Sequence, residues 1–252
     1  MFKKLNLIVF LILIATLVTT YFTRNNYRNI DNIHPAILTI PKQESLKDNK
    51  QFTFDREGYR YEVTPLFDYE INGFIVSSYN YAFIRFYKRD NVFPVDLCML
   101  WGKNMETKIY QSKDVNFSQD TRFCYFSYTG EVSFNHDEIS NNHIVVDNDM
   151  LEKQFTSLNS GDQVRIKGKL VNIKATSISK LNEYDPPYFE WNTSTTREDS
   201  GAGACETIYV EELEILQKGN HISALLFTVS IYALIVYTVI NIILILIPYL
   251  KS

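Results

Sequence analysis

The residues of this chain that could bind an anion or transfer a proton gather in one short string near residue 200. Arg197, Asp199 and Glu206 lie within ten residues of one another, with Gly201 and Gly203 between them. A guanidinium can hold an anionic group through two parallel hydrogen bonds, and either carboxylate could act as a general base. The structural alternative is an ion-pair network that braces a loop. The Gly-x-Gly element is no phosphate loop, because no Lys-Ser/Thr follows it and the next segment is strand-like.

Asn142 and His143 form the second candidate group, in the polar string Ser140-Asn-Asn-His. We include both in the candidate ligand-binding set with the 197–206 string, while a cap or turn at the start of a strand is the structural alternative. His136 and His143 are seven residues apart, which is not a recognised ligand spacing, and a third ligand is missing. We therefore predict no metal site and no cofactor.

Three cysteines, Cys98, Cys124 and Cys205, lie in the middle of the chain. In an oxidising compartment they allow one disulfide and one free thiol. Cys98 and Cys124 both fall in strand-like segments, which makes them the favoured pair. Three buried free thiols are the alternative. No C-x-x-C pattern occurs, so zinc or thioredoxin-type chemistry has no support.

Two apolar runs, one at each end of the chain, flank the candidate residues described above and are expected to anchor the chain in a membrane. Leu5 to Phe22 is a run of about 18 residues, and Ile222 to Tyr249 is an uncharged run of about 28 residues. A helix rises about 1.5 Å per residue, so each run can cross a hydrocarbon core of about 30 Å. The first run ends without a small-residue cleavage pattern. We therefore expect an uncleaved N-terminal transmembrane anchor at 1–23 and a C-terminal transmembrane helix at 222–249.

Positive charge sets the expected orientation of the two spans. Lys3 and Lys4 precede the first span and Lys251 follows the second, while Arg24 and Arg28 lie on the domain side. The bias is slight, but the first helix usually dominates the orientation. We expect an integral membrane protein of the bacterial inner membrane, with both termini in the cytoplasm and the central domain in the periplasm.

The net charge of the segment between the two apolar runs limits the kinds of molecule that it could bind. All 29 acidic residues lie between the two runs, against 22 of the basic residues, so this segment carries a net charge of −7. Surfaces that bind phosphate backbones are usually basic, so the balance argues against general nucleic-acid binding. The expected partners are the lipid bilayer and other envelope proteins; the sequence sets no oligomeric state. About 195 residues suffice for one domain with a core.

Within the middle segment, residue patterns predict a β-rich domain. Residues 24–55 lack a period and are expected to form a tether to a domain at 56–217. A helix is expected over Asp147–Leu158, with Asp147 as its N-cap and Gly161 near its C-terminal cap. Residues 79–87 are expected to form a helix or a turn. Residues 176–203 are expected to be mostly loop. Pro65 should mark an edge or a bend. Alternation of apolar and polar residues, or buried apolar runs, predict strands at 59–77, 93–101, 123–128, 144–146, 164–173 and 207–216.

The order of elements from residue 147 onward resembles the last third of an OB-fold, in which a helix leads into strands four and five. The string Gly161-Asp-x-Val-x-Ile-x-Gly168-x-Leu170 and the strand Tyr209 to Leu216 carry this resemblance over about 65 residues. Gly168 falls mid-strand, where such barrels need a close backbone approach. The resemblance implies an OB-like barrel of α+β class between two transmembrane helices, and it implies no ligand.

Three strings, 193–207, 96–102 and 140–143, together resemble a set of uncharacterised bacterial envelope proteins with a short N-terminal anchor and a C-terminal span. That similarity covers most of the chain and implies no activity.

The sequence thus favours a membrane-anchored, non-enzymatic binding or assembly module of the cell envelope. One alternative is a membrane-tethered hydrolase that uses Asp199, Glu206 and His143; their meeting in one open cleft would favour the enzyme, and their burial in salt bridges the module. Another is an accessory subunit or sensor of a larger complex, which Asn241 facing away from the first span would support. No catalytic motif such as G-x-S-x-G or H-E-x-x-H occurs.

Overall fold

The chain folds into two compact units, seen in a computed structural model. One unit combines Met1–Asn26 with Asn220–Ser252, and the other is Tyr27–Gly219. The structure describes residues 2–24, 26–81, 93–179, 186–197, 201, 204–219 and 222–250.

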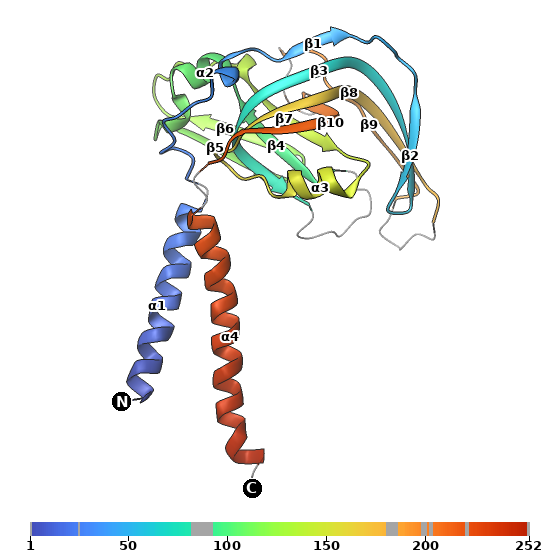
Figure 1. Ribbon diagram of the computed structural model, residues 1–252. Helices are drawn as coiled ribbons and strands as arrows, with labels where there is room; N and C mark the ends of the chain where they lie inside the picture. The colour runs from blue at the N-terminus through green and yellow to red at the C-terminus, as the bar shows by residue number, and fades with distance from the viewer. Residues whose placement is uncertain are drawn as a thin grey trace. The chain divides into compact units, whose positions relative to one another are not determined.

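The first unit is a pair of antiparallel helices, α1 (Phe2–Thr23) and α4 (Ile222–Leu250), which lie side by side (Figure 1). Both are long and apolar enough to cross a membrane by length and composition. Two aromatic contacts join them, Phe10 with Tyr237 at 5.8 Å between ring centroids and Tyr21 with Phe227 at 5.9 Å. The two apolar helices expected at the ends of the chain are confirmed, and they suggest insertion into a membrane.

A polar contact fixes the register of this helix pair. Asn6 donates from Nδ2 to Oδ1 of Asn241 at 2.7 Å, and Asn241 donates to the Tyr237 carbonyl one turn earlier at 2.8 Å. The Tyr237 hydroxyl donates to the Asn6 carbonyl at 3.1 Å. A side-chain amide in an apolar surrounding needs a hydrogen-bond partner, so the bond between Asn6 and Asn241 favours this alignment of the two helices.

The second unit is built on a mixed sheet, in which the described residues form eight strands (Figure 1). The sheet order is β1-β3-β4-β7-β10-β8-β9; β2 also pairs with β3, and β3 pairs with β8. The β7–β10 pairing is parallel and the others are antiparallel. The strands are β1 (Lys42–Ser45), β2 (Phe52–Arg56), β3 (Tyr59–Asn80), β4 (Val95–Leu100), β7 (Ile139–Val145), β8 (Gln163–Ser177), β9 (Tyr188–Trp191) and β10 (Glu206–Gln217).

A separate hairpin and short helices complete this unit. Strands β5 (Val115–Asp120) and β6 (Phe123–Tyr128) pair only with each other among the described strands. The remaining elements are α2 (Gly102–Glu106), α3 (Asp149–Thr156) and the 3-10 turns Pro35–Leu38, Ile109–Gln111 and His136–Glu138.

Two residues explain how the longest strands fit together. Pro65 lies in β3 between the stretches that pair with β2 and β1, at a register shift in the pairing with β8. Proline has no N–H to donate, so this break in the ladder is where it is tolerated, as expected. A Cβ added to Gly168 of β8 would lie 2.0 Å from the Tyr209 carbonyl oxygen. The close backbone approach expected at Gly168 is confirmed.

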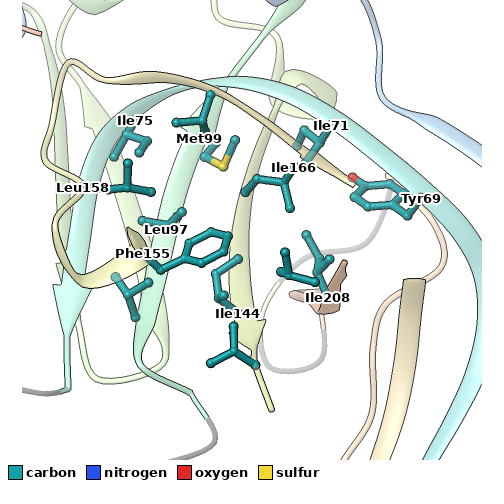
Figure 2. Close-up of a cluster of buried hydrophobic side chains, with 14 of the residues drawn as sticks. Tyr69, Ile71, Ile75, Leu97, Met99, Ile144, Phe155, Leu158, Ile166 and Ile208 are labelled. Carbon is teal, nitrogen blue, oxygen red and sulfur yellow. The ribbon is translucent and has the colours of Figure 1, made fainter. Parts of the chain in front are cut away.

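The core of this unit lies on both faces of the sheet. Successive residues of a strand point to opposite faces, so Ile144 packs into one cluster and Val145 into another. Phe155 of α3 packs into the first cluster. Figure 2 shows apolar side chains of this cluster from five strands, from α3 and from Leu158 just after α3: Tyr69, Ile71, Ile75, Leu97, Met99, Ile144, Phe155, Leu158, Ile166 and Ile208. The second cluster is richer in tyrosine and includes Tyr59 and Tyr61, both fully buried.

Residues 27–55, expected to be a tether, belong to the folded unit. Tyr27, Ile30 and Ile37 are buried, and β1 and β2 both pair with β3. The Tyr110 hydroxyl donates to the Ile30 carbonyl at 2.6 Å. The prediction of a tether was wrong because residues far along the chain cover these apolar side chains. The side chains themselves follow neither the helix nor the strand repeat, so the local sequence did not indicate that they are buried.

Helix α3 is shorter than expected and capped by a different residue. Asn148 accepts from the Leu151 N–H at 3.0 Å as the N-cap, whereas Asp147 accepts from the Tyr209 hydroxyl at 2.7 Å. Gly161 does not cap the helix; it lies beyond the cap Ser157, with φ of +95°.

Two further segments contain strand residues that were not expected. The segment 176–203, expected to be mostly loop, contains β9, which pairs with β8. The expected helix or turn at 79–87 begins as strand, because β3 continues to Asn80; its remainder from residue 82 lies outside the described residues. Strands at 93–101, 123–128, 144–146, 164–173 and 207–216 are confirmed within a few residues of their bounds.

Candidate functional site

Glu206, which is buried, forms an ion pair with the partly exposed Arg197. Glu206 begins β10 and is 2% exposed; its Oε1 contacts Nη1 of Arg197. The other terminal nitrogen of Arg197 donates to the Tyr69 hydroxyl, and the guanidinium carbon lies 5.2 Å from the Tyr69 ring centroid and 5.4 Å from that of Trp101. The pair therefore ties the segment before β10 to β3 and the end of β4. Asp199, the third member of the predicted string, lies outside the described residues.

Asn142 and His143 are neighbours in β7, and their side chains serve different networks. Asn142 is fully buried and donates to the Leu97 carbonyl at 3.1 Å and to Ser140 Oγ at 3.0 Å. These bonds satisfy its amide group internally. Strand geometry turns His143 to the other face, so the structure does not bring His143 together with Glu206.

His143 pairs instead with Asp96, a residue that the sequence reading did not select. The two are directly opposite each other on β7 and β4, both are fully buried, and Nδ1 of His143 lies 2.9 Å from Oδ1 of Asp96. The Tyr81 hydroxyl donates to the other carboxylate oxygen at 2.6 Å. Nη1 of Arg122 lies 3.6 Å from Asp96 Oδ1.

The β5–β6 hairpin brings Arg122 to this pair. Arg122 occupies the turn with φ of +73°, and its guanidinium carbon lies 4.1 Å from the Tyr81 ring centroid, 4.5 Å from that of Phe93 and 5.4 Å from that of Trp191. Cation–π contacts of this kind compensate for part of the lost hydration of a covered guanidinium.

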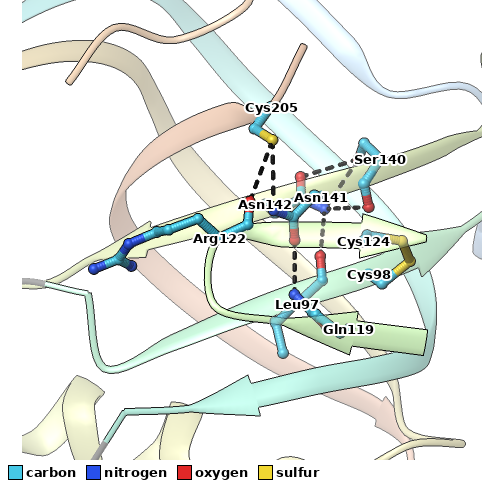
Figure 3. The surroundings of a disulfide bond; sticks show 9 residues. All are labelled: Leu97, Cys98, Gln119, Arg122, Cys124, Ser140, Asn141, Asn142 and Cys205. Carbon is cyan, nitrogen blue, oxygen red and sulfur yellow. Dashed lines mark hydrogen bonds between the residues drawn. A yellow bond between two sulfur atoms is a disulfide. The ribbon is translucent and has the colours of Figure 1, made fainter. Parts of the chain in front are cut away.

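A disulfide between Cys98 of β4 and Cys124 of β6 fastens the hairpin to the main sheet (Figure 3). The bond lies two residues from Arg122 in sequence. Asn141 of β7 donates to the Arg122 carbonyl at 2.9 Å and accepts from Gln119 at 2.8 Å. The hairpin is thus held by one covalent link and a hydrogen-bond network at its turn.

The electrostatics of this cluster favour a charged histidine. Burial disfavours the imidazolium form of His143, but the Asp96 carboxylate and the Cys205 thiol outweigh it and raise the pKa of His143 to about 9. Burial, and after it the Asp96 carboxylate, raise the pKa of Tyr81 far above its ordinary value. At neutral pH His143 is therefore a cation and Tyr81 a neutral donor.

Cys205 completes the cluster at its solvent side. Its Sγ accepts from Asn141 Nδ2 at 3.5 Å, and its S–H donates to the Arg122 carbonyl at 3.9 Å. Cys205 is half-buried and lines a cleft of about 340 Å³. We call this the Cys205 cleft; its walls include Phe123, Tyr125, Phe126 and Asn141.

A larger groove lies on another part of the domain. It measures about 900 Å³ and runs between the β1–β2 segment and strands β3, β8 and β10. We call it the strap groove. Lysines and carboxylates alternate along it and form ion pairs, Lys42 with Glu70 at 3.3 Å and Lys169 with Asp68 at 2.7 Å. Its surface therefore offers mixed charge, and the aromatic side chains Phe52, Tyr69 and Tyr209 also line it.

Sequence reasoning selected His143 and Glu206 and missed Asp96, Arg122 and Cys205. The sequence does contain a signal for Asp96, since a carboxylate inside an apolar strand needs a buried partner. It contains no such signal for Arg122, which lies in a polar turn.

The chain matches no protein-family model, no curated protein and no solved structure. Its function is therefore argued from the geometry above.

Proposed function

We propose that this chain is a membrane-anchored, non-enzymatic binding or assembly module of the cell envelope. The observation that carries the proposal is the burial of the predicted site residues in internal pairs. Glu206 is paired with Arg197 and Asn142 is bonded within the sheet. Side chains held this way stabilise the domain, and the strap groove, of about 900 Å³, stays open to a partner.

Within this proposal, the domain is an OB-like barrel. The pairings β3–β4, β4–β7, β7–β10, β10–β8 and β8–β3 return to the starting strand. Helix α3 lies between β7 and β8 in the chain. A closed circuit of five strands with a helix before the fourth is the order that the OB-fold has.

We further place both termini in the cytoplasm and the domain in the periplasm of the bacterial inner membrane. Antiparallel packing of α1 and α4 supports termini on one side of the bilayer, and the lysines at both ends favour the cytoplasmic side. The Cys98–Cys124 disulfide fits an oxidising compartment.

Geometry disfavours the two alternatives. A hydrolase built on Glu206 and His143 would need both side chains in one cleft, but the two residues pair with different partners, Arg197 and Asp96. A subunit that docks through Asn241 would need that amide on an outer face, but it bonds Asn6 of the other helix.

The experiment is site-specific photo-crosslinking in intact cells. A photoreactive residue replaces Lys50, which lines the strap groove, and in a matched variant it replaces the exposed Lys153 on α3. We expect a discrete envelope protein or glycan to be linked from position 50 and absent from position 153. Identical products from both positions, or none from position 50, would contradict a binding role for the groove.

A further inference from the structure

We propose that the strap groove binds an uncharged oligosaccharide, whose hydroxyl groups hydrogen-bond to the ion pairs of the groove floor and whose sugar rings pack against the aromatic side chains beside it. This inference rests on the binding role proposed above for the groove, and it names the chemical class of the ligand.

The floor of the groove consists of two rows of charged side chains that cross three adjacent strands. In the order β1, β3 and β8, the rows are Lys42–Glu70–Lys167 and Glu44–Asp68–Lys169. Residues that lie opposite each other in a sheet, or two apart along one strand, share a face. All six line the groove, so its floor presents ammonium and carboxylate groups side by side.

Most of these charges are already paired within the floor. Lys42 Nζ lies 3.3 Å from a carboxylate oxygen of Glu70. Lys169 Nζ lies 2.7 Å from Asp68 and 3.3 Å from Glu211 of β10. Five lysines and five carboxylates line the groove, although the segment between the apolar runs carries a net charge of −7. A charged ligand would have to compete with these internal partners, so the balance favours an uncharged one.

A hydroxyl group suits such a surface because it can donate one hydrogen bond and accept others. It can donate to a carboxylate and accept from an ammonium group without separating the ion pair, and hydrogen bonds to charged groups are the stronger kind. The paired side chains are open to solvent, with exposed fractions of 65% for Lys42 and 22% for Glu70. The groove volume of about 900 Å³ is near the upper end of ligand sites. Several sugar units in a row can therefore bind along the floor.

Two aromatic rings provide an apolar surface beside the charged rows. Phe52 of β2 and Tyr209 of β10 are half-buried and line the groove, with ring centroids 4.8 Å apart. Tyr209 lies opposite Lys169 in the pairing of β10 with β8, and its hydroxyl already donates to Asp147 at 2.7 Å. Aromatic rings supply a large apolar surface, against which the C–H groups of a sugar ring can pack. The groove thus combines polar and apolar contacts of the kind that a sugar ring requires.

The same features disfavour a protein or a phosphate polymer as the ligand. The core of a protein interface is depleted in charged residues and contains apolar anchors, whereas ion pairs form this floor. Covering them with a protein would remove their hydration at a large cost. A phosphate polymer binds through an excess of basic side chains, and the lysines here are matched by carboxylates.

Isothermal titration calorimetry on the full chain tests the ligand class. The chain is kept in a polyoxyethylene detergent, which has no sugar head group, and is titrated with three uncharged hexamers: maltohexaose, cellohexaose and chitohexaose. We expect at least one of them to bind with a dissociation constant of about 1 mM or lower. Because binding of an uncharged ligand releases no counterions, its affinity should change less than about twofold between 50 and 300 mM salt.

Charged hexamers of the same length serve as comparison ligands. A hexamer of glucosamine, which is cationic, and one of galacturonic acid, which is anionic, should each bind about tenfold more weakly, since each must compete with the internal ion pairs. The proposal would be overturned if none of the uncharged hexamers binds, or if a charged hexamer binds as tightly as they do.

A matched pair of variants locates the site. Phe52→Ala should weaken binding of the uncharged hexamer about tenfold, whereas Phe123→Ala, at an exposed aromatic side chain that does not line the groove, should leave it unchanged. If Phe52→Ala does not fold, Lys42→Gln at the exposed end of the first row should weaken binding about fivefold. Parent-like affinity in the folded groove variant would show that the sugar binds elsewhere.

The crosslinking experiment from position 50 distinguishes a failure of this inference from a failure of the binding role on which it rests. If a discrete protein is linked from position 50 and no uncharged hexamer binds, the groove keeps its binding role and the sugar ligand is refuted. If position 50 gives no product and no hexamer binds, both proposals are refuted.

Discussion

The Asp96–His143 pair makes the stability of the domain depend on pH. The pKa of His143 is raised to about 9 in the folded chain, against about 6.5 in an unfolded chain. The imidazolium is therefore bound more tightly in the folded state. Its contribution is fully present below about pH 6.5 and is lost as the pH rises through about 9.

The magnitude follows from the pKa difference. A shift of about 2.5 units at about 1.4 kcal/mol per unit gives a contribution on the order of 3 kcal/mol. His143 and Asp96 are fully buried, so solvent screens little of it. The scan should stop near pH 9.5, because tyrosines begin to ionise in the unfolded chain at about pH 10.

Denaturant unfolding of the full chain in detergent measures this effect. Both tryptophans, Trp101 and Trp191, are in the second unit, and the Trp191 ring lies 4.9 Å from that of His143. Their fluorescence should report a free energy of unfolding that falls by about 3 kcal/mol between pH 6.5 and 9.5. In Asp96→Asn the slope should largely disappear. A stability that stays flat or rises over this range would refute the pairing.

Three other perturbations have defined outcomes. Gly168→Ala should prevent β8 and β10 from pairing, because the new Cβ would lie 2.0 Å from the Tyr209 carbonyl oxygen; circular dichroism should show loss of strand structure. Replacing both cysteines of the disulfide by serine should cost about 3–4 kcal/mol in denaturant unfolding, given its loop of 26 residues. Asn241→Leu removes the bond to Asn6 and should weaken the helix pair by about 1 kcal/mol, measured by reversible unfolding in bicelles.

Each of these has its own control. Lys167→Ala next to the glycine should leave the β8–β10 pairing intact, and a folded Gly168→Ala would contradict the close approach. Cys205→Ser should keep the free energy of unfolding of the parent chain. If the variant that lacks both disulfide cysteines also keeps it, the disulfide has no structural role. Asn241→Gln should retain part of the contact, and equal effects of Gln and Leu would show that the amide is not used.

Local patterns predicted much of the fold because they reflect local causes. The apolar ends and the alternating strands at 164–173 and 207–216 need only their own residues to be recognised. The folded structure of residues 27–55 and strand β9 were not predicted, because both depend on partners elsewhere in the chain. The Tyr110 hydroxyl donates to the Ile30 carbonyl, and β8 pairs with residues 188–191.

The candidate site was predicted only in part for the same reason. Arg197 and Glu206 are near in sequence, and their pairing was among the alternatives weighed. His143 was selected with the wrong neighbours, since the contact that it makes is with Asp96 on β4. Strand register, which the sequence pattern alone does not supply, places Asp96 beside it.

The claim on which the functional account rests is that both terminal helices lie in a bilayer. Extraction of cell membranes with alkaline carbonate tests it most directly, because this treatment strips peripheral proteins and leaves spanning ones. The account predicts that the full chain sediments with the membranes. Recovery of the chain in the soluble fraction would contradict it.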